Sequence, residues 1–171
     1  KAEKLAILIT KKYPAHEYAW KILAAVQEQT GRVLEAKQAN QKALSIAPRD
    51  PEVHLCLGNN FNQLGKFEDA ELSYKKAIAL KPDYVQAHYN LGFVLKNTQR
   101  FDEAVSIYQK LIELNPSFAQ AYYNLSLSLK ELGQLKKAIV NFKKAIAIKP
   151  DYALAYLNLG AALRDSGQKE E

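Results

Sequence analysis

The sequence predicts an all-α solenoid of antiparallel helix pairs, and two regular spacings carry that prediction. Five of the six prolines recur every 34 residues, at Pro14, Pro48, Pro82, Pro116 and Pro150. The glycines follow the same period in two phases, Gly58, Gly92 and Gly160 in one and Gly31, Gly65, Gly133 and Gly167 in the other. Such a period indicates one supersecondary unit repeated along the chain, which buries its apolar face only against its neighbours. With 48% hydrophobic and 25% charged residues and no linker-like tract, residues 1–171 are expected to form a single array.

The unit from Val85 to Phe118 shows why each element is expected. Apolar and small residues at three- and four-residue spacing predict a first helix over 85–98, and the same pattern predicts a second over 101–114. Pro116 ends the second helix because proline lacks the N–H group that would continue it. The same reading gives a second helix over 1–14, full units over 17–50, 51–84, 85–118 and 119–152, and a first helix over 153–171.

The glycines and the caps refine this picture. One glycine phase follows the first helix, where a left-handed residue ends a helix at little cost, and Gln99 in that place predicts a strained turn. The other phase lies inside helices, which indicates close approach of the second helix, with small residues facing small residues. Three residues just after the prolines are expected to cap the next helix: Asp83, Ser117 and Asp151.

The chain resembles the tetratricopeptide repeat (TPR) family over almost its whole length. On the first helices the matching residues are Trp20-Leu23-Ala24, Leu57-Gly58-Phe61, Leu91-Gly92-Leu95, Tyr122-Leu125-Ser126 and Tyr156-Leu159-Gly160. On the second helices they are Ala70-Tyr74-Ala77-Pro82, Ala104-Tyr108-Leu111-Pro116 and Ala138-Phe142-Ala145-Pro150, whereas Gln27 and Asn40 depart from the pattern. The resemblance implies a right-handed superhelix whose first helices line a concave groove.

Three asparagines in one register make that groove the candidate binding site. Asn90, Asn124 and Asn158 could each pair with a peptide backbone, since a carboxamide both donates and accepts. This resembles the asparagine ladder in the repeat arm of O-linked N-acetylglucosamine transferase. In the alternative interpretation the asparagines tie adjacent helices together. The predicted peptide-binding residues are completed by Asn59, Tyr89, Phe93, Tyr123, Leu127 and Leu157.

No catalytic, metal or cofactor site is predicted. His54 and His88 share a packing register, Cys56 is the only cysteine, and no phosphate-binding loop or nucleophile set is present. The cationic side chains that a carboxylate clamp for acidic C-termini needs are missing from the groove positions. The net charge of +6 is ascribed to solvated helix surfaces such as Lys75-Lys76 and Lys143-Lys144, so neither nucleic acid nor membrane insertion is expected.

The sequence therefore predicts a non-enzymatic, cytoplasmic scaffold that binds an extended peptide or a partner protein. The alternative is a substrate-recruiting or targeting arm of a larger enzyme, of the glycosyltransferase or sulfotransferase class. The chain begins in mid-repeat, which is typical of a segment of a longer protein. Leu5, Leu8 and Ile9 at one end, and Leu159 and Leu163 at the other, predict end-to-end self-association or fraying of the termini.

Overall fold

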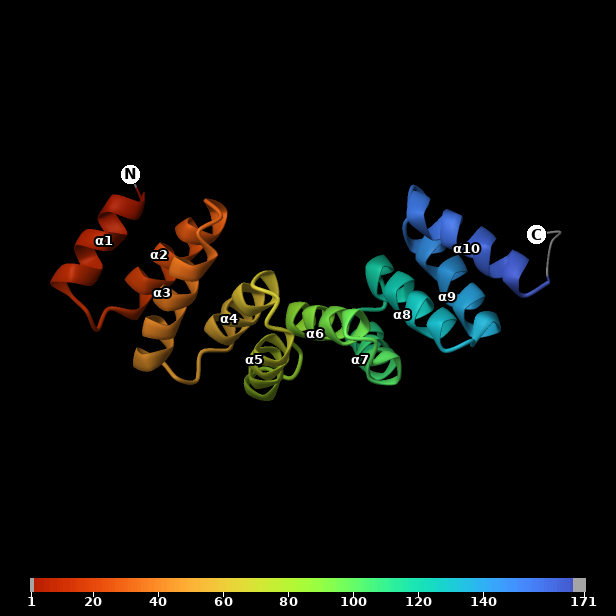
Figure 1. The fold of residues 1–171 in the computed structure, drawn as a ribbon, viewed down its shortest axis with the longest axis horizontal. Coiled ribbons are helices and arrows are strands. Elements are labelled where there is room, and N and C mark those ends of the chain that lie inside the picture. Colours follow the sequence, from red (N-terminus) through yellow and green to blue (C-terminus); the bar gives the residue numbers. More distant parts are fainter. Residues whose placement is uncertain (1, 168–171) are drawn as a thin grey trace. The chain divides into compact units, whose positions relative to one another are not determined.

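The computed structural model of the chain describes residues 2–167 and confirms the all-helical class (Figure 1). Within those residues it contains ten helices and no strand. The helices are α1 (Ala2–Lys12), α2 (Glu17–Gln29), α3 (Val33–Ile46), α4 (Pro51–Gln63), α5 (Phe67–Leu80), α6 (Val85–Asn97), α7 (Phe101–Leu114), α8 (Ala119–Glu131), α9 (Leu135–Ile148) and α10 (Ala153–Asp165). The helices predicted over 85–98 and 101–114 are present as α6 and α7, with ends within one residue of the prediction. The helix predicted over 153–171 is present as α10 but ends earlier, at Asp165, and residues 168–171 of that prediction lie outside the described residues.

The helices cluster into two compact units, which divide between Ala87 and His88. In the N-terminal unit (residues 1–87), α2 packs on α3 and α4 on α5. In the C-terminal unit (residues 88–171), α8 packs on α7 and α9, and α10 packs on α9. Within each unit, consecutive helices run in opposite directions (Figure 1), as predicted. That all the repeats form one uninterrupted array stays a prediction.

Aromatic rings from the second helices fill the space beside the helical glycines. A Cβ atom at Gly92 would lie 2.8 Å from two ring atoms of Tyr108, and Gly58 faces Tyr74 in the same way. The expected lack of room for a side chain is therefore confirmed at these two glycines, and a tyrosine ring of the second helix fills the space. Gly160 differs, because a Cβ atom there would meet no described atom within 4 Å.

Hydrogen bonds replace the aromatic ring in the first full repeat. Asn40 occupies the place of Tyr74, and its Nδ2 donates to Asn60 Oδ1 at 2.9 Å and to Glu28 Oε1 at 3.3 Å. Asn60 Nδ2 donates to the same Glu28 oxygen at 2.7 Å. Both asparagines are buried. Polar groups in such a site need these bonds, since a buried amide without a partner is costly.

The turn after each first helix has the geometry that the sequence predicts. Gln99 has a φ of 60°, in the left-handed region, as do the glycines at the equivalent positions. Glutamine therefore adopts a conformation that costs an L-residue with a Cβ atom about 1–2 kcal/mol. The expected strain of this turn is confirmed.

The predicted helix caps are wrong by one residue. The residues that precede α8 and α10 are Phe118 and Tyr152, and neither gives a side-chain cap. Ser117 instead donates its hydroxyl to Asn115 Oδ1 at 2.9 Å within the turn. Asp83 and Asp151 share that earlier register, one residue ahead of the N-cap position. Asp50 stands in the cap register itself, and its carboxylate accepts from the backbone N–H groups at the start of α4.

Candidate functional site

Two asparagines on the first helices of the C-terminal unit bridge to the preceding first helix. Asn124 Nδ2 donates to the hydroxyl of Tyr89 at 3.4 Å and to the carbonyl of Gln120 at 3.0 Å. Asn158 Nδ2 repeats this arrangement 34 residues later, with the hydroxyl of Tyr123 at 3.2 Å and the carbonyl of Leu154 at 2.9 Å. These bonds correspond to the alternative interpretation, in which the asparagines tie helices together. Asn90, the third member of the register, is half-buried on α6.

The bridges leave the tyrosine hydroxyl protons available. Each hydroxyl accepts a bond from an asparagine, and neither Tyr89 nor Tyr123 donates to a protein acceptor in the described residues. Both side chains are half-buried. Because a hydroxyl both accepts and donates, the hydroxyls of Tyr89 and Tyr123 could each donate to a peptide carbonyl. The amide of Asn124 is less accessible to a ligand, since the residue is only 5% exposed and both of its polar side-chain atoms are hydrogen-bonded.

Lys96 belongs to this surface, although the sequence pattern did not single it out. Its Nζ donates to Asn124 Oδ1 at 3.1 Å and lies 5.2 Å from the centre of the Phe93 ring. Burial lowers the pKa of this lysine. Its register could have found it, because Lys130 and Arg164 follow at 34-residue steps in the last turns of α8 and α10. A cation there also suits the negative end of the helix dipole.

The predicted aromatic and apolar residues frame the same surface. The ring of Tyr89 lies 5.3 Å from that of Phe118, and the ring of Tyr123 lies 4.9 Å from that of Tyr152. Burial raises the pKa of Tyr152 to about 12, so its hydroxyl stays protonated. Phe93 and Leu127 are half-buried, whereas Leu157 is 70% exposed. Leu157 is thus the predicted site residue most accessible to a partner.

In the N-terminal unit the corresponding surface has a hollow of about 210 Å³ between α2 and α4. Ile22, Ala25 and Cys56 contribute to its lining, and Lys21 at its edge forms ion pairs with Asp50 and Glu52. Asn59 is engaged within its own repeat, since its Oδ1 accepts from the hydroxyl of Tyr74 at 2.9 Å.

Cys56 and His54 lie among the packing residues of α4. Burial, followed by the charges of Glu28 and Glu52, raises the pKa of Cys56 to about 12, so its thiol stays protonated at neutral pH. His54 is buried with its Nε2 3.1 Å from the carbonyl of Pro48, just as Trp20 donates to the carbonyl of Pro14. The interpretation of His54 as a packing residue with a polar edge is confirmed.

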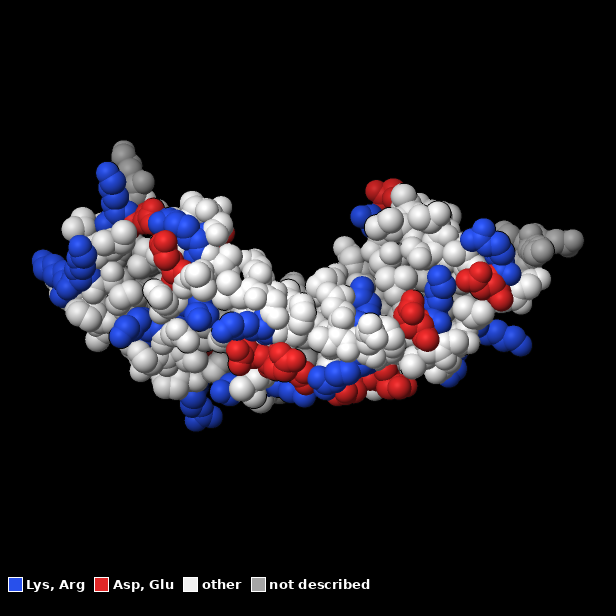
Figure 2. All heavy atoms as spheres, in the orientation of Figure 1, with Lys and Arg blue, Asp and Glu red and all other residues white. Residues whose placement is uncertain are grey.

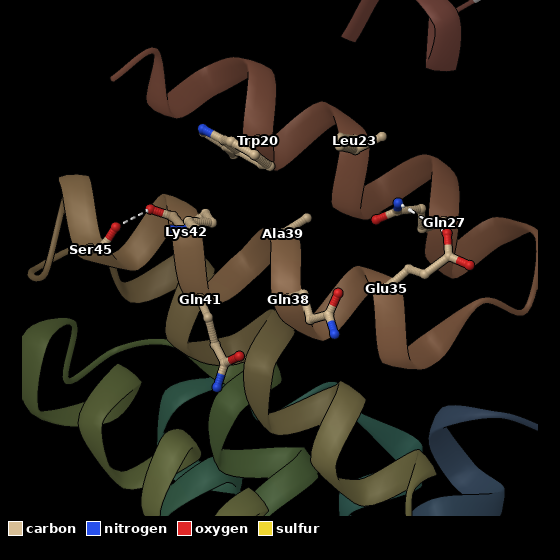
Figure 3. Close-up of a pocket in the computed structure, with 9 residues that line it drawn as sticks. All are labelled: Trp20, Leu23, Gln27, Glu35, Gln38, Ala39, Gln41, Lys42 and Ser45. Carbon is tan, nitrogen blue, oxygen red and sulfur yellow. Dashed lines mark hydrogen bonds between the residues drawn. The ribbon is translucent and has the colours of Figure 1, made fainter. Parts of the chain in front are cut away.

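Two larger hollows open beside the second helices. One, of about 670 Å³, lies between α2 and α3, with Trp20, Leu23 and Ala39 among its lining residues (Figure 3). There Gln27 Nε2 donates to Glu35 at 3.3 Å, while Gln27 Oε1 is buried without a described partner. The other, of about 470 Å³, lies at the matching position of α8 and α9 and is completed by α7.

On the face that Figure 2 shows, basic and acidic side chains are interspersed in each unit. Among residues 2–167, no helix is both long enough and apolar enough to cross a membrane. The same residues contain no group of three or more His, Cys, Asp or Glu side chains that could hold a metal ion.

Family models and solved structures match this chain. Models described as TPR repeat match residues 58–99 and 127–167, and models described as tetratricopeptide repeat match 107–140 and 85–118. A crystal structure of MamA is 31% identical over 86% of this chain and 86% of its own, with a TM-score of 0.83. MamA from Desulfovibrio magneticus RS-1 is 23% identical over 90% of this chain and 87% of its own, with a TM-score of 0.86.

A third solved structure is YrrB, described as a TPR protein with an unusual peptide-binding site. It is 24% identical over 91% of this chain and 80% of its own, with a TM-score of 0.83. No curated protein matches the chain. None of these matches supports a particular resemblance to the arm of O-linked N-acetylglucosamine transferase. The repeat models, together with the identity to MamA over most of both chains, show that this protein belongs to the tetratricopeptide repeat family.

Proposed function

We propose that the chain is a protein-interaction scaffold that binds an extended peptide, or an extended segment of a partner protein, on its first helices. The observation that carries the proposal is the repeated pairing of Tyr89 with Asn124 and of Tyr123 with Asn158. Each pair orients a hydroxyl whose proton is unused, at a step of one repeat. Neighbouring helices pack about 8–10 Å apart, which matches roughly three residues of extended peptide.

The recognition groups differ from those that the sequence alone suggested. In this proposal the tyrosine hydroxyls donate to peptide carbonyls, and the asparagines orient the tyrosines. Two such bonds supply only about 1–3 kcal/mol, whereas a micromolar complex needs about 8 kcal/mol. Apolar contacts must supply the remainder, and Phe93, Leu127 and Leu157 lie on the same helices. Lys96 adds a preference for a carboxylate or a carbonyl beside its ammonium group.

Crosslinking from defined positions tests this proposal. A photoreactive phenylalanine analogue at Leu157 should capture a partner from a lysate of the source organism, and the double variant Tyr89→Phe, Tyr123→Phe should reduce that capture. The same analogue at the exposed Lys110, on a second helix, is the matched control. Capture that the double variant leaves unchanged would contradict the role of the hydroxyls. Equal capture from Lys110 would contradict the choice of surface.

We retain the expectation of a non-enzymatic, cytoplasmic scaffold and add self-association as a second property. Leu5 and Leu8 on α1 are 59% and 64% exposed, which is the apolar surface that end-to-end contact would bury. Sedimentation velocity should therefore show a mass that rises with concentration, and Leu5→Lys with Leu8→Lys should abolish the rise. A monomer at every concentration would refute this proposal.

A further inference from the structure

The hollow beside α9 in the C-terminal unit combines an apolar lining with a basic rim. Its volume is about 470 Å³, and its apolar lining includes Ile112, Tyr122, Leu125 and Val140. Val140 is 52% exposed, although valine is normally a core residue. The lining also contains three lysines, from α9, and no aspartate or glutamate. The hollow therefore offers apolar contact at its base and positive charge at its mouth.

Two of the three rim lysines, Lys136 and Lys137, are a local exception within the repeats, whereas the register of Lys144 carries a lysine in every full repeat. In the first turn of the second helix, the earlier repeats carry Leu34-Glu35, Glu68-Asp69 and Asp102-Glu103, and the last full repeat carries Lys136-Lys137. Acidic residues in a first turn interact favourably with the helix dipole, whereas lysines there are unfavourable. Helix stability thus does not explain the two lysines. Across its whole length α9 contains four lysines and no acidic residue.

The lysines that line the hollow form no ion pair with another lining residue, because the lining contains no aspartate or glutamate. Lys137 Nζ donates to the neutral Gln134 at 2.9 Å, and Lys144 Nζ lies 5.7 Å from the centre of the Tyr122 ring. On the facing helix α7, Glu113 is paired with Lys110 at 2.9 Å. The carboxylate that follows the lining residue Ile112 in the chain therefore already has a cationic partner outside the hollow.

We propose that this hollow binds an acidic amphipathic segment of a partner protein. One large apolar side chain of the segment enters the hollow and contacts Tyr122, Leu125 and Val140. Flanking aspartates or glutamates lie against Lys136, Lys137 and Lys144. Such a segment uses the apolar base and the basic rim together, which explains why both occur at one place. The hollow is lined by the second helices α7 and α9 and by one side of α8, and neither Tyr89 nor Tyr123 of the proposed function lines it.

An acidic protein segment fits this hollow better than a nucleic acid or an anionic membrane surface does. Nucleic acids bind through stacking platforms or basic grooves, and the one ring here, Tyr122, lies at the base of the hollow and is only 8% exposed. A membrane surface is recognised by apolar side chains that protrude into it, whereas this apolar surface is recessed. A recess accepts a protruding side chain, which a peptide supplies.

The matching hollow of the N-terminal unit is a natural comparison. It has a larger volume, and Glu35 stands where Lys137 stands in the other (Figure 3). Gln27 replaces the apolar Leu129, and its Oε1 is buried without a described partner. An acidic segment would meet the carboxylate of Glu35 there, and Lys42, at the register of Lys144, is the one cation of that lining. The proposal therefore assigns the acidic partner to the C-terminal unit alone.

Selection from a displayed library of random 12-residue peptides tests the proposal with the full chain. Peptides are selected on the wild type and then on the variant Lys136→Glu, Lys137→Asp, which restores the charges of the earlier repeats. The control Lys66→Glu, Lys76→Glu makes the same change in net charge at exposed positions at and within α5. Thermal unfolding of all three proteins shows that they are folded, and the first variant should be at least as stable as the wild type.

Peptides that bind the wild type and the control but not the first variant should be rich in acidic residues around one large apolar residue. For one such peptide, the first variant should weaken binding about tenfold, as expected for two exposed ion pairs turned into repulsions. Val140→Ser, which introduces the residue that α7 carries at this register, should also weaken it. The proposal is overturned if the selected peptides have no acidic bias, or if they bind the first variant as well as the wild type. It is also overturned if single-stranded DNA or phosphatidylserine vesicles bind more tightly than these peptides do and their binding depends on Lys136.

Discussion

Replacing Tyr108 by phenylalanine should stabilise the protein, although the same change at Tyr74 should destabilise it. Both rings are buried against a helical glycine. The hydroxyl of Tyr74 donates to Asn59 at 2.9 Å, whereas the hydroxyl of Tyr108 is buried with no partner among the described residues. The residue fifteen positions before Tyr108 is Phe93, which has no acceptor to replace the oxygen of Asn59. Burial, with the nearby Tyr89, raises the pKa of Tyr108, as expected of a hydroxyl removed from water.

The sizes of the two effects follow from hydrogen-bond energetics. Removing a satisfied bond at Tyr74 should cost about 1 kcal/mol, and removing an unsatisfied buried hydroxyl at Tyr108 should gain about 1 kcal/mol or more. With a urea dependence of about 2 kcal/mol per molar, the two midpoints should move by about 0.5 M in opposite directions. Chemical denaturation followed by circular dichroism measures both shifts.

A third variant makes the reasoning specific. Phe93→Asn introduces the acceptor that the repeat with Tyr74 possesses, so Tyr108→Phe should become destabilising in that background. The double-mutant cycle isolates this coupling from the apolar contacts that Phe93 loses. If Tyr108→Phe lowers the midpoint in the wild type as much as Tyr74→Phe does, the hydroxyl of Tyr108 is not unsatisfied and the reasoning is refuted.

Three further predictions concern the turns, the glycines and pH. Gln99→Gly should raise the free energy of unfolding by about 1 kcal/mol, because the left-handed φ no longer strains a side chain; an unchanged urea midpoint would argue against strain. Gly92→Ala should lower the free energy of unfolding by about 1–3 kcal/mol, because its methyl group overpacks against the ring of Tyr108. Gly160→Ala, with open space around it, should raise the free energy of unfolding by about 1 kcal/mol. Equal shifts of the two urea midpoints would contradict this prediction. Burial would raise the pKa of Asp50, but its bonds to Lys21 and to backbone N–H groups lower it on balance. The ionised Asp50 therefore stabilises the folded protein at neutral pH, and this contribution is lost below about pH 4, as the carboxylate is protonated. Lys21→Met should reduce the loss of unfolding free energy measured between pH 7 and pH 3.

The fold could be predicted from the sequence because its information is periodic. Prolines and glycines at fixed steps mark the ends of helices, and a left-handed turn such as that at Gln99 follows from register alone. The N-cap register could not be fixed in the same way. Ser117 and Asp151 are good capping residues, but a turn that is one residue longer places aromatic residues at the caps.

The candidate site was less predictable, because short polar side chains can choose among several partners. The sequence places Asn124 on the correct helix, but it does not show whether the amide faces a ligand, the carbonyl of its own preceding turn or a side chain of the preceding first helix. The structure gives it the last two. Lys96 was missed for a related reason: the helix dipole already explains a cation in each of these last turns, so the recurrence of Lys96, Lys130 and Arg164 did not by itself indicate a site. Its burial, which lowers its pKa, is what marks Lys96 as unusual.

The polar pair Asn40 and Asn60 has a consequence for how the chain opens. A linear array has no central core, so its opening is decided by the weakest contact between neighbouring helices. Here α3 contacts α4 through the hydrogen bonds of Asn40, Asn60 and Glu28, and water can replace these bonds when the helices separate. The later repeats have a buried aromatic ring at this place, whose apolar contacts water cannot replace. Local unfolding should therefore begin at this seam, and amide protons of α1 to α3 should exchange before those of α4 and α5. The first full repeat would then separate from α4 and α5 while these two helices stay folded.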